Sequence, residues 1–255
     1  MCFGGCRGAV RSQLRRAVLG WLVVTMLIAV WGVAPGVGKS TLCAALAGWL
    51  AGTGLRVDHF AEEEILTRPE FVEVAAYFGA TGRVEPAMLL AAASGLARSA
   101  LAGGFDVVVA DAVVPFVPWL LSMGCSDQAV SAFVAELTGL LAPVRPVLVF
   151  LDGDPATALA RAVAREEPGW LDWYTGKLAG YGLTPRPGDV ATAVRYLEHE
   201  RTLTLSAARQ AGWPVITIGR ATELTGAEIV RAARQALSQL LVTVRHRPRP
   251  PPGGP

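Results

Sequence analysis

The chain has 255 residues, of which 52% are hydrophobic and 17% are charged, and its formal net charge is +2 at pH 7. This length suits one compact α/β domain or two small ones, and a nearly neutral chain gives no electrostatic reason to expect nucleic acid as a partner. The cysteines show neither metal-site spacing nor a disulfide framework, which favours a reducing, cytoplasmic setting. They are Cys2, Cys6, Cys43 and Cys125.

The N-terminal segment combines positive charge with a long uncharged stretch. Four arginines between residues 7 and 16 precede residues 17–38, which carry no charge, and this pattern resembles a signal peptide or a membrane anchor. The second half of the stretch, however, is expected to form a strand that is buried on both faces, and one segment cannot also span a bilayer. We therefore interpret residues 1–25 as an N-terminal extension or the product of a misassigned start site, with membrane anchoring as the alternative.

The segment after that strand has the composition of a phosphate-binding loop. The apolar run over 27–31 predicts a strand, and glycines separate it from a helix expected over 39–52. Glycines let backbone N–H groups converge on an anion, and the positive end of the helix dipole adds to the attraction. Lys39 is expected to reach the β- and γ-phosphates of a nucleotide, and the Ser40 hydroxyl to ligate Mg²⁺. The expected nucleotide-binding residues are Pro35, Gly36, Val37, Gly38, Lys39, Ser40 and Thr41.

The loop departs from the strict phosphate-loop pattern at its first glycine. That position holds Val33, and the nearest glycine, Gly32, comes one residue too early. The first glycine mainly eases the exit from the strand, whereas the later glycines, the lysine and the serine contact the anion, and all of these are present. The alternative is a glycine-rich turn in which Lys-Ser occurs by chance.

Short β-branched strands alternate with helices along the rest of the chain. The alternation predicts an α/β fold with a parallel sheet of five strands and helices on both faces. Ligands of such folds bind outside the carboxyl ends of the strands. We expect further strands over 55–60, 105–111, 147–152 and 213–218, and further helices over 62–79, 86–102, 127–141, 155–166, 168–180, 188–211 and 223–242.

Carboxylates occur at two of these strand ends. Asp111 ends its strand, where it can meet Mg²⁺ through water or hold a substrate hydroxyl; the alternative is a helix cap or a turn residue. Glu62 lies nearest the end of the strand over 55–60, where a carboxylate could accept the proton of an attacking hydroxyl. Other candidates for that base are Asp58, Glu63 and Glu64.

Two arginines lie on one face of the helix over 155–166. Arg161 and Arg165 are four residues apart, so that both project from the same side. Paired guanidinium groups suit the negative charge that builds on a phosphoryl group during its transfer. The alternative is that they pair with Glu166, Glu167 or solvent, as arginines on many helices do.

The order of these features resembles the P-loop kinases of nucleosides and nucleotides, in particular the thymidylate-kinase and deoxynucleoside-kinase branch. The likeness rests on the Gly-x-Gly-Lys-Ser-Thr loop, the strand-end acids, the strand that ends in Asp111, and the segment from Asp152 to Arg161. It covers residues 27–240, and the loop is its specific part. The branch usually follows its third-strand acid with an arginine, where this chain has Ala112.

The resemblance implies a three-layer P-loop NTPase fold whose kinase-like domain spans 26–242 and carries a mobile helical lid over about 161–189. It also implies ATP and Mg²⁺ as cofactors and a small-molecule phosphate acceptor as the partner. The composition of residues 243–255 predicts a disordered tail rich in arginine and proline. We expect neither nucleic acid nor a membrane as a partner, and we leave a homodimer open.

The expected function is transfer of the γ-phosphoryl group of ATP to a hydroxyl or phosphate acceptor, which we expect to be a nucleoside or nucleotide. The alternatives are a P-loop ATPase and a nucleotide-binding regulatory protein without kinase activity. A GTPase of the usual form is not expected, because its guanine-reading Asn-Lys-x-Asp motif needs asparagine and the chain contains none. The expected catalytic residues are Lys39, Asp111, Arg161, Arg165 and Glu62, and the expected metal ligands are Ser40 and Asp111.

Overall fold

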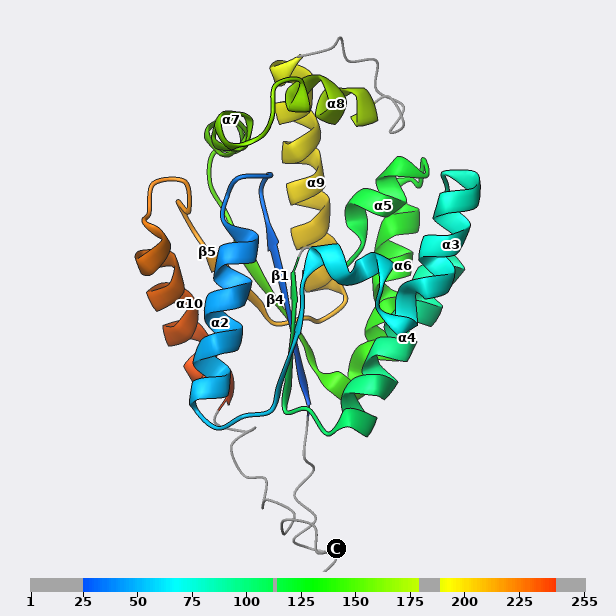
Figure 1. Ribbon diagram of the computed structural model, residues 1–255, viewed down its shortest axis with the longest axis vertical. Coiled ribbons are helices and arrows are strands. Elements are labelled where there is room, and N and C mark those ends of the chain that lie inside the picture. The colour runs from blue at the N-terminus through cyan, green and yellow to red at the C-terminus, as the bar shows by residue number, and fades with distance from the viewer. Residues whose placement is uncertain (1–24, 112–113, 179–188, 242–255) are drawn as a thin grey trace, which may run out of the picture.

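The computed structural model describes residues 25–111, 114–178 and 189–241 (Figure 1). Its strands form one five-stranded sheet in the order β2-β3-β1-β4-β5, and all neighbouring strands run parallel. The predicted α/β fold with a five-stranded parallel sheet is therefore confirmed. The strands are β1 (Met26–Gly32), β2 (Val57–Phe60), β3 (Val107–Asp111), β4 (Pro146–Leu151) and β5 (Val215–Ile218).

Several sequence-based expectations concern parts of the chain outside the described residues. They include almost all of the predicted extension over 1–25 and the whole of the predicted tail over 243–255. Residues 179–188 of the predicted lid and Ala112 also lie outside the described residues.

Strand β1 occupies the centre of the sheet, between β3 and β4. Ile28 pairs with Val109 on one side and with Val147 on the other, and every residue of these three strands is buried. A strand covered on both faces is expected to be continuously apolar, which explains why this part of the chain looks like a membrane segment in the sequence. Within the described residues, no helix has the length and apolar character needed to cross a bilayer.

Helices cover both faces of the sheet (Figure 1). One face carries α2 and α10, the other carries α4, α6 and α9, and the pair α7 and α8 lies across the carboxyl ends of the strands. The helices are α2 (Lys39–Gly52), α3 (Val72–Thr81), α4 (Pro86–Gly103), α5 (Val117–Ser122), α6 (Asp127–Leu141), α7 (Pro155–Arg165), α8 (Trp170–Lys177), α9 (Val190–Gln210) and α10 (Gly226–Leu241), with 3₁₀ turns η1 (Glu62–Leu66), η2 (Pro69–Phe71) and η3 (Ala142–Val144).

Proline explains both places where the predicted elements were wrong. The helix expected over 62–79 is replaced by η1, η2 and α3, because Pro69 lacks an N–H group and holds Arg68 in an extended conformation. Helix α5 was not predicted, because Pro115 and Pro118 interrupt this part of the sequence. Pro118 nevertheless lies in the first turn of α5, where a missing N–H group breaks no helical hydrogen bond.

Candidate functional site

The loop between β1 and α2 leaves the sheet at its centre, where the chain order reverses and ligands of open α/β sheets bind. Gly36 and Gly38 have φ angles of +82° and +102°, in the left-handed region that favours glycine. A Cβ at Gly36 would lie 2.3 Å from the carbonyl oxygen of Ala158 and 2.8 Å from the nitrogen of Ala162, both in α7. Glycine is therefore required there by the turn and by the close approach of α7.

The first turn of α2 has N–H groups that face away from the helix body. Gly38 is the N-cap residue, and no side chain caps the helix. The free N–H groups and the dipole of a 14-residue helix together favour an anion at this end. Ser40 and Thr41, in the same turn, are exposed. This geometry fits the phosphate-binding role that the sequence predicts for residues 35–41.

Val33 stands where the strict pattern has its first glycine, and it continues the central strand β1 beyond Gly32. Its N–H group donates to the carbonyl of Leu151 at 2.9 Å, which extends the pairing of β1 with β4 by one residue, and its side chain is buried. The close approach that needs glycine lies one residue earlier: a Cβ at Gly32 would come 2.5 Å from Cγ1 of Val37. The shifted glycine is therefore accounted for by packing within the loop.

Lys39 lies over the loop that it is predicted to serve. Its Nζ donates to the carbonyl of Ala34 at 3.2 Å and lies 5.9 Å from the centroid of the Trp31 ring. A backbone carbonyl is a weaker partner for an ammonium group than a phosphate oxygen, because both partners are charged in the second case. The Lys39 ammonium group is thus held close to the loop by a carbonyl oxygen, which an anion could displace as its partner.

Asp111 ends β3 beside the first turns of α2. It is buried, and its Oδ1 has no hydrogen-bond partner among the described residues. The pKa of the neighbouring Cys43 thiol is raised, first by burial and then by the charge of Asp111 and a hydrogen bond with it, while Lys39 acts in the opposite direction. A buried carboxylate oxygen without a partner, near Lys39 and the start of α2, fits a ligand of Mg²⁺ or of its water.

Glu62 is the acidic residue of the 58–64 segment that faces this site. Its side chain is exposed to solvent overall, but neighbouring atoms shield the carboxyl group and this raises its pKa; Lys39 lowers the pKa, and Asp111 raises it again. Asp58 instead accepts two hydrogen bonds from Arg68, at 2.8 and 2.7 Å. Among the candidates for a proton acceptor, Glu62 is therefore the one with electrostatic contact to the loop lysine.

Glu64 and Glu63 are placed differently from Glu62. The Glu64 carboxylate accepts a hydrogen bond at 3.1 Å from the same Arg68 that binds Asp58, so that both acids belong to an ion-pair network beside β2. Glu63 is exposed, as Glu62 is, and its charge raises the pKa of Glu62.

Lys177, on α8, is close enough to Glu62 to interact with its charge, and no role for this lysine was predicted from the sequence. Its Nζ lies 3.5 Å from the centroid of the Trp173 ring. Burial lowers its pKa, and the charge of Glu62 raises it. The one feature of the sequence that could have drawn attention to Lys177 is the rarity of lysine, because Lys39 and Lys177 are the only lysines in the chain. Both of them lie within electrostatic reach of Glu62.

The two arginines of α7 bind neighbours outside the loop. The Arg161 guanidinium donates to the carbonyl of Thr222, in the segment between β5 and α10. Arg165 pairs with Glu166, and its side chain is 67% exposed. The structure therefore brings Lys39, Asp111 and Glu62 together, as the sequence predicts, and leaves Arg161 and Arg165 with other partners.

Substitution of either arginine tests the expectation from the sequence that both act on a transferring phosphoryl group. If that expectation holds, Arg161→Ala and Arg165→Ala should lower kcat by about tenfold or more while changing KM less, since charge on the phosphoryl group is greatest in the transition state. Steady-state kinetics measures both constants, with exposed Arg209→Ala as the control. A change confined to KM would instead identify a ground-state anchor.

A buried glutamate lies behind the loop and was also missed in the sequence. Glu200, on α9, accepts a hydrogen bond from Nε1 of Trp31 at 3.1 Å, and the hydroxyl of Tyr196 lies close enough to lower its pKa. Burial raises its pKa to about 7, and Lys39, Tyr196 and Trp31 act against that shift. Glu200 therefore connects α9 to the end of β1, directly before the loop.

Glu200→Gln is expected to stabilise the protein at alkaline pH. The folded-state pKa of about 7 lies above the ordinary value of 4.5, so ionisation of the wild-type carboxyl destabilises the fold progressively between these values. Above pH 7 the variant should therefore be more stable by about 3 kcal/mol, and the difference should vanish as the pH falls below 4.5. Urea unfolding at pH 4.5 and 8 measures this, with exposed Glu198→Gln on the same helix as the control. A pH-independent difference would contradict the assignment.

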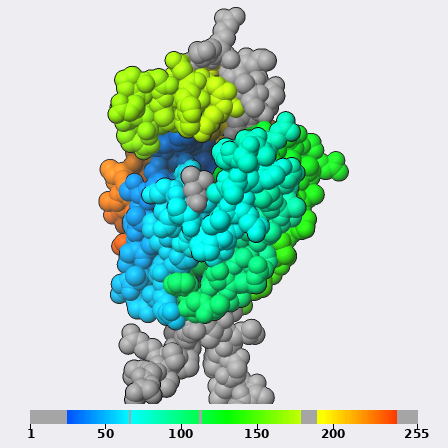
Figure 2. Space-filling model, turned by 45° about the vertical axis from the view of Figure 1, so that its right-hand side comes forward, coloured from blue at the N-terminus to red at the C-terminus, as the bar shows by residue number. Residues whose placement is uncertain are grey.

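The phosphate loop forms the floor of a recess on the surface of the molecule. In Figure 2 the dark blue residues that follow β1 are visible between the yellow-green pair α7 and α8 and the cyan segment of η1 and α3. Comparison with known proteins gives no family: no protein-family model matches the chain, and no curated protein sequence matches it. Its function is therefore inferred from the chemistry of this recess.

Proposed function

We propose that the chain is an ATP-dependent small-molecule kinase that transfers the γ-phosphoryl group to a hydroxyl or phosphate acceptor. The observation that carries this proposal is the meeting of Lys39, Asp111 and Glu62 beside a glycine loop that opens a helix. Lys177, from the other side of the recess, adds a second cation. These are a phosphate cradle, a metal-binding carboxylate and a proton acceptor, which together suit phosphoryl transfer.

Each residue has a distinct role in the proposed reaction. The N–H groups of the loop and of the first turn of α2 bind the β- and γ-phosphates, and Lys39 leaves the Ala34 carbonyl to join them. Ser40 and Asp111 hold Mg²⁺ or its water, and the metal, when bound, offsets the negative charge of the phosphates. Glu62 accepts the proton of the attacking hydroxyl, for which a raised pKa is favourable.

The finer description of the fold belongs to the same proposal. The sheet order, the loop after the central strand and the helices on both faces support a three-layer P-loop NTPase fold. Helices α7 and α8 lie over the loop and bring Lys177 to it, which supports their role as a lid. The free thiols of Cys43 and Cys125 agree with a cytoplasmic setting.

A radioactive transfer assay separates the proposed kinase from the alternatives. Purified protein is incubated with [γ-³²P]ATP, Mg²⁺ and a panel of nucleosides, nucleotides and sugars, and labelled products are separated from inorganic phosphate. The kinase proposal expects a labelled acceptor and slow release of phosphate without one. Rapid release of phosphate without an acceptor would identify an ATPase. Binding of ATP with neither reaction would identify a regulatory protein.

A further inference from the structure

The ammonium group of the loop lysine faces an aromatic ring that a glutamate of α9 holds in place. Nζ of Lys39 lies 5.9 Å from the centroid of the Trp31 ring, a distance at which the ring attracts a cation. Nε1 of Trp31 donates to Oε1 of Glu200 at 3.1 Å. Because this hydrogen bond holds the ring to α9, the surface that Lys39 faces depends on Glu200.

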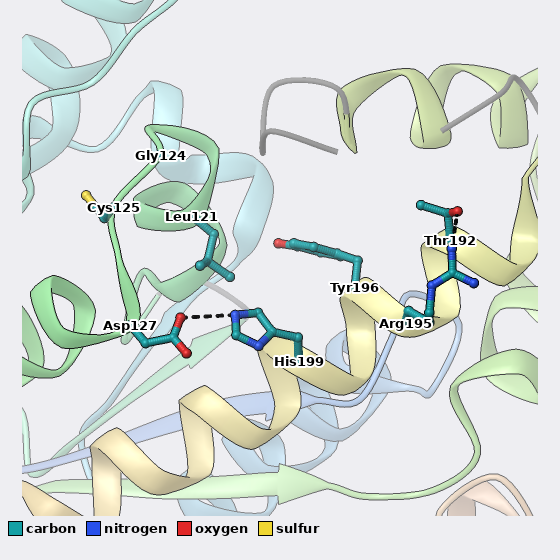
Figure 3. A pocket seen from close by; sticks show the side chains of 8 residues that line it. All are labelled: Leu121, Gly124, Cys125, Asp127, Thr192, Arg195, Tyr196 and His199. Carbon is teal, nitrogen blue, oxygen red and sulfur yellow. Dashed lines mark hydrogen bonds and ion pairs between the residues drawn. The ribbon is translucent and has the colours of Figure 1, made fainter. Parts of the chain in front are cut away.

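The carboxyl group of Glu200 is shielded from solvent. The residue is 6% exposed, and it does not line the cavity of about 350 Å³ into which Tyr196, one helical turn earlier, extends (Figure 3). The charged groups on that side, His199 and Asp127, face each other, with Nε2 and Oδ1 3.1 Å apart. A negative charge on Glu200 is therefore costly, because little water reaches it.

The arginines on the elements around Glu200 have other partners. Arg201, the next residue in the chain, pairs with Asp152 directly after β4, with Nη2 and Oδ2 2.7 Å apart. Arg161 of α7 donates to a backbone carbonyl of the segment between β5 and α10. Within the residues that the structure describes, no basic side chain forms an ion pair with Glu200. The cation whose charge lowers its pKa is Lys39.

A nucleotide at the loop changes the charges that Glu200 experiences. In the proposed reaction the ammonium group of Lys39 leaves the Ala34 carbonyl and joins the phosphates. The phosphates then neutralise the cation that favours an ionised Glu200, and they add negative charge on the same side. Both changes favour the uncharged carboxyl group.

We propose that Trp31 and Glu200 are positioning residues for Lys39, and that binding of a nucleoside triphosphate at the loop is accompanied by uptake of a proton from solvent onto Glu200. The proposal rests on the proposed kinase function and adds a form of regulation to the same site. Since linkage is reciprocal, conditions that favour the neutral carboxyl group also favour the bound nucleotide. Burial raises the pKa of Glu200 to about 7, so the effect falls near neutral pH.

The pH dependence of nucleotide affinity tests the proposal. The Kd of a non-hydrolysable ATP analogue is measured at pH 6 and pH 8.5, with saturating Mg²⁺, for the full chain and for Glu200→Gln. Glutamine keeps an oxygen that can accept from Trp31 but cannot ionise. If binding raises the pKa of Glu200 by about one unit, the wild-type Kd should rise about fivefold more over this range than the Kd of the variant. Titration of Glu62 or of the nucleotide affects both proteins and cancels in the comparison.

The direction of the difference separates a positioning role from a merely structural one. At pH 6 the two proteins should bind alike, and at pH 8.5 Glu200→Gln should bind more tightly. The control Glu198→Gln, at an exposed position of the same helix, should behave as the wild type does. Equal pH dependence of wild type and Glu200→Gln overturns the proposal, and so does weaker binding by folded Glu200→Gln at pH 8.5.

Two further measurements do not depend on the folding of Glu200→Gln. Trp31→Phe keeps a ring for Lys39 but removes the N–H group that stabilises an ionised Glu200, so the rise in Kd should move to higher pH by about one unit. Calorimetry of wild-type protein at pH 7.5, in PIPES and in Tris, should show net uptake of protons when the analogue binds. An unchanged midpoint in folded Trp31→Phe overturns the proposal, as does binding by the wild type without proton uptake.

The affinity of wild-type protein for the analogue distinguishes this proposal from the proposed function. If the analogue does not bind at any pH, the kinase proposal fails and this one fails with it. If it binds with the same pH dependence in wild type and Glu200→Gln, only the role of Glu200 is overturned.

Discussion

Replacement of Lys39 by alanine is expected to lower the rate of phosphoryl transfer by about 10²-fold or more, the scale of losing one preorganised contact to the transition state. The ammonium group lies over the loop and donates to the carbonyl of Ala34, a contact that a phosphate can displace. Few other contacts depend on it, so we expect the free energy of unfolding to change by less than about 0.5 kcal/mol. Single-turnover kinetics with [γ-³²P]ATP measures the rate.

Two further variants serve as controls that show whether the effect is specific to Lys39. Arg209→Ala removes an exposed positive charge at the far end of α9 and should leave the rate unchanged. Lys177→Ala removes the other lysine and should lower the rate less than Lys39→Ala, because Lys177 reaches the site from α8 and not from the loop. Equal rates for Lys39→Ala and the wild type would remove the basis for a nucleotide site in the loop.

The second large effect is expected from Asp111→Asn, which should lower Mg²⁺-dependent transfer by about 10²-fold or more. The change keeps the shape of the side chain but removes the charge that a hard cation prefers. The Asp111 carboxylate is buried, its Oδ1 has no hydrogen-bond partner in the part of the chain that the structure describes, and burial of a charge is costly. We therefore expect the melting temperature of the variant to stay the same or rise, although its activity falls.

Measurements over a range of Mg²⁺ concentrations provide the control for Asp111→Asn. The variant should need more metal to reach half of its own maximal rate, whereas Asp106→Asn, at the other end of the same strand segment, should not. Loss of activity together with loss of folding would contradict a role in metal binding and indicate a structural role for the carboxylate.

The sequence predicted the features that depend on local signals. A continuous apolar run, two glycines and a helix start are adjacent in the chain, so the loop around Gly36 and Gly38 could be recognised without any knowledge of tertiary contacts. The parallel sheet followed from the alternation of strands and helices. Asp111 and Glu62 could be placed near the loop because residues that follow parallel strands meet at one edge of the sheet.

The features that the sequence did not predict depend on contacts between distant residues. Trp31 and Glu200 are 169 residues apart, and no local pattern indicates that they share a hydrogen bond. Arg161 was correctly placed on a helix, but its partner, the Thr222 carbonyl, is 61 residues away. A helix face predicts the direction of a side chain, whereas its partner depends on how the helices pack.

The contact between Gly36 and α7 fixes the helix that covers the loop. Because the loop apex touches the backbone at Ala158 and Ala162, α7 cannot move away without a change in the loop itself. Helix α8 is tied down as well, since Thr175 and Leu178 are buried and Leu178 belongs to the hydrophobic core. Any motion of α8 that uncovers the proposed nucleotide site would therefore have to expose these side chains, which makes opening costly in free energy.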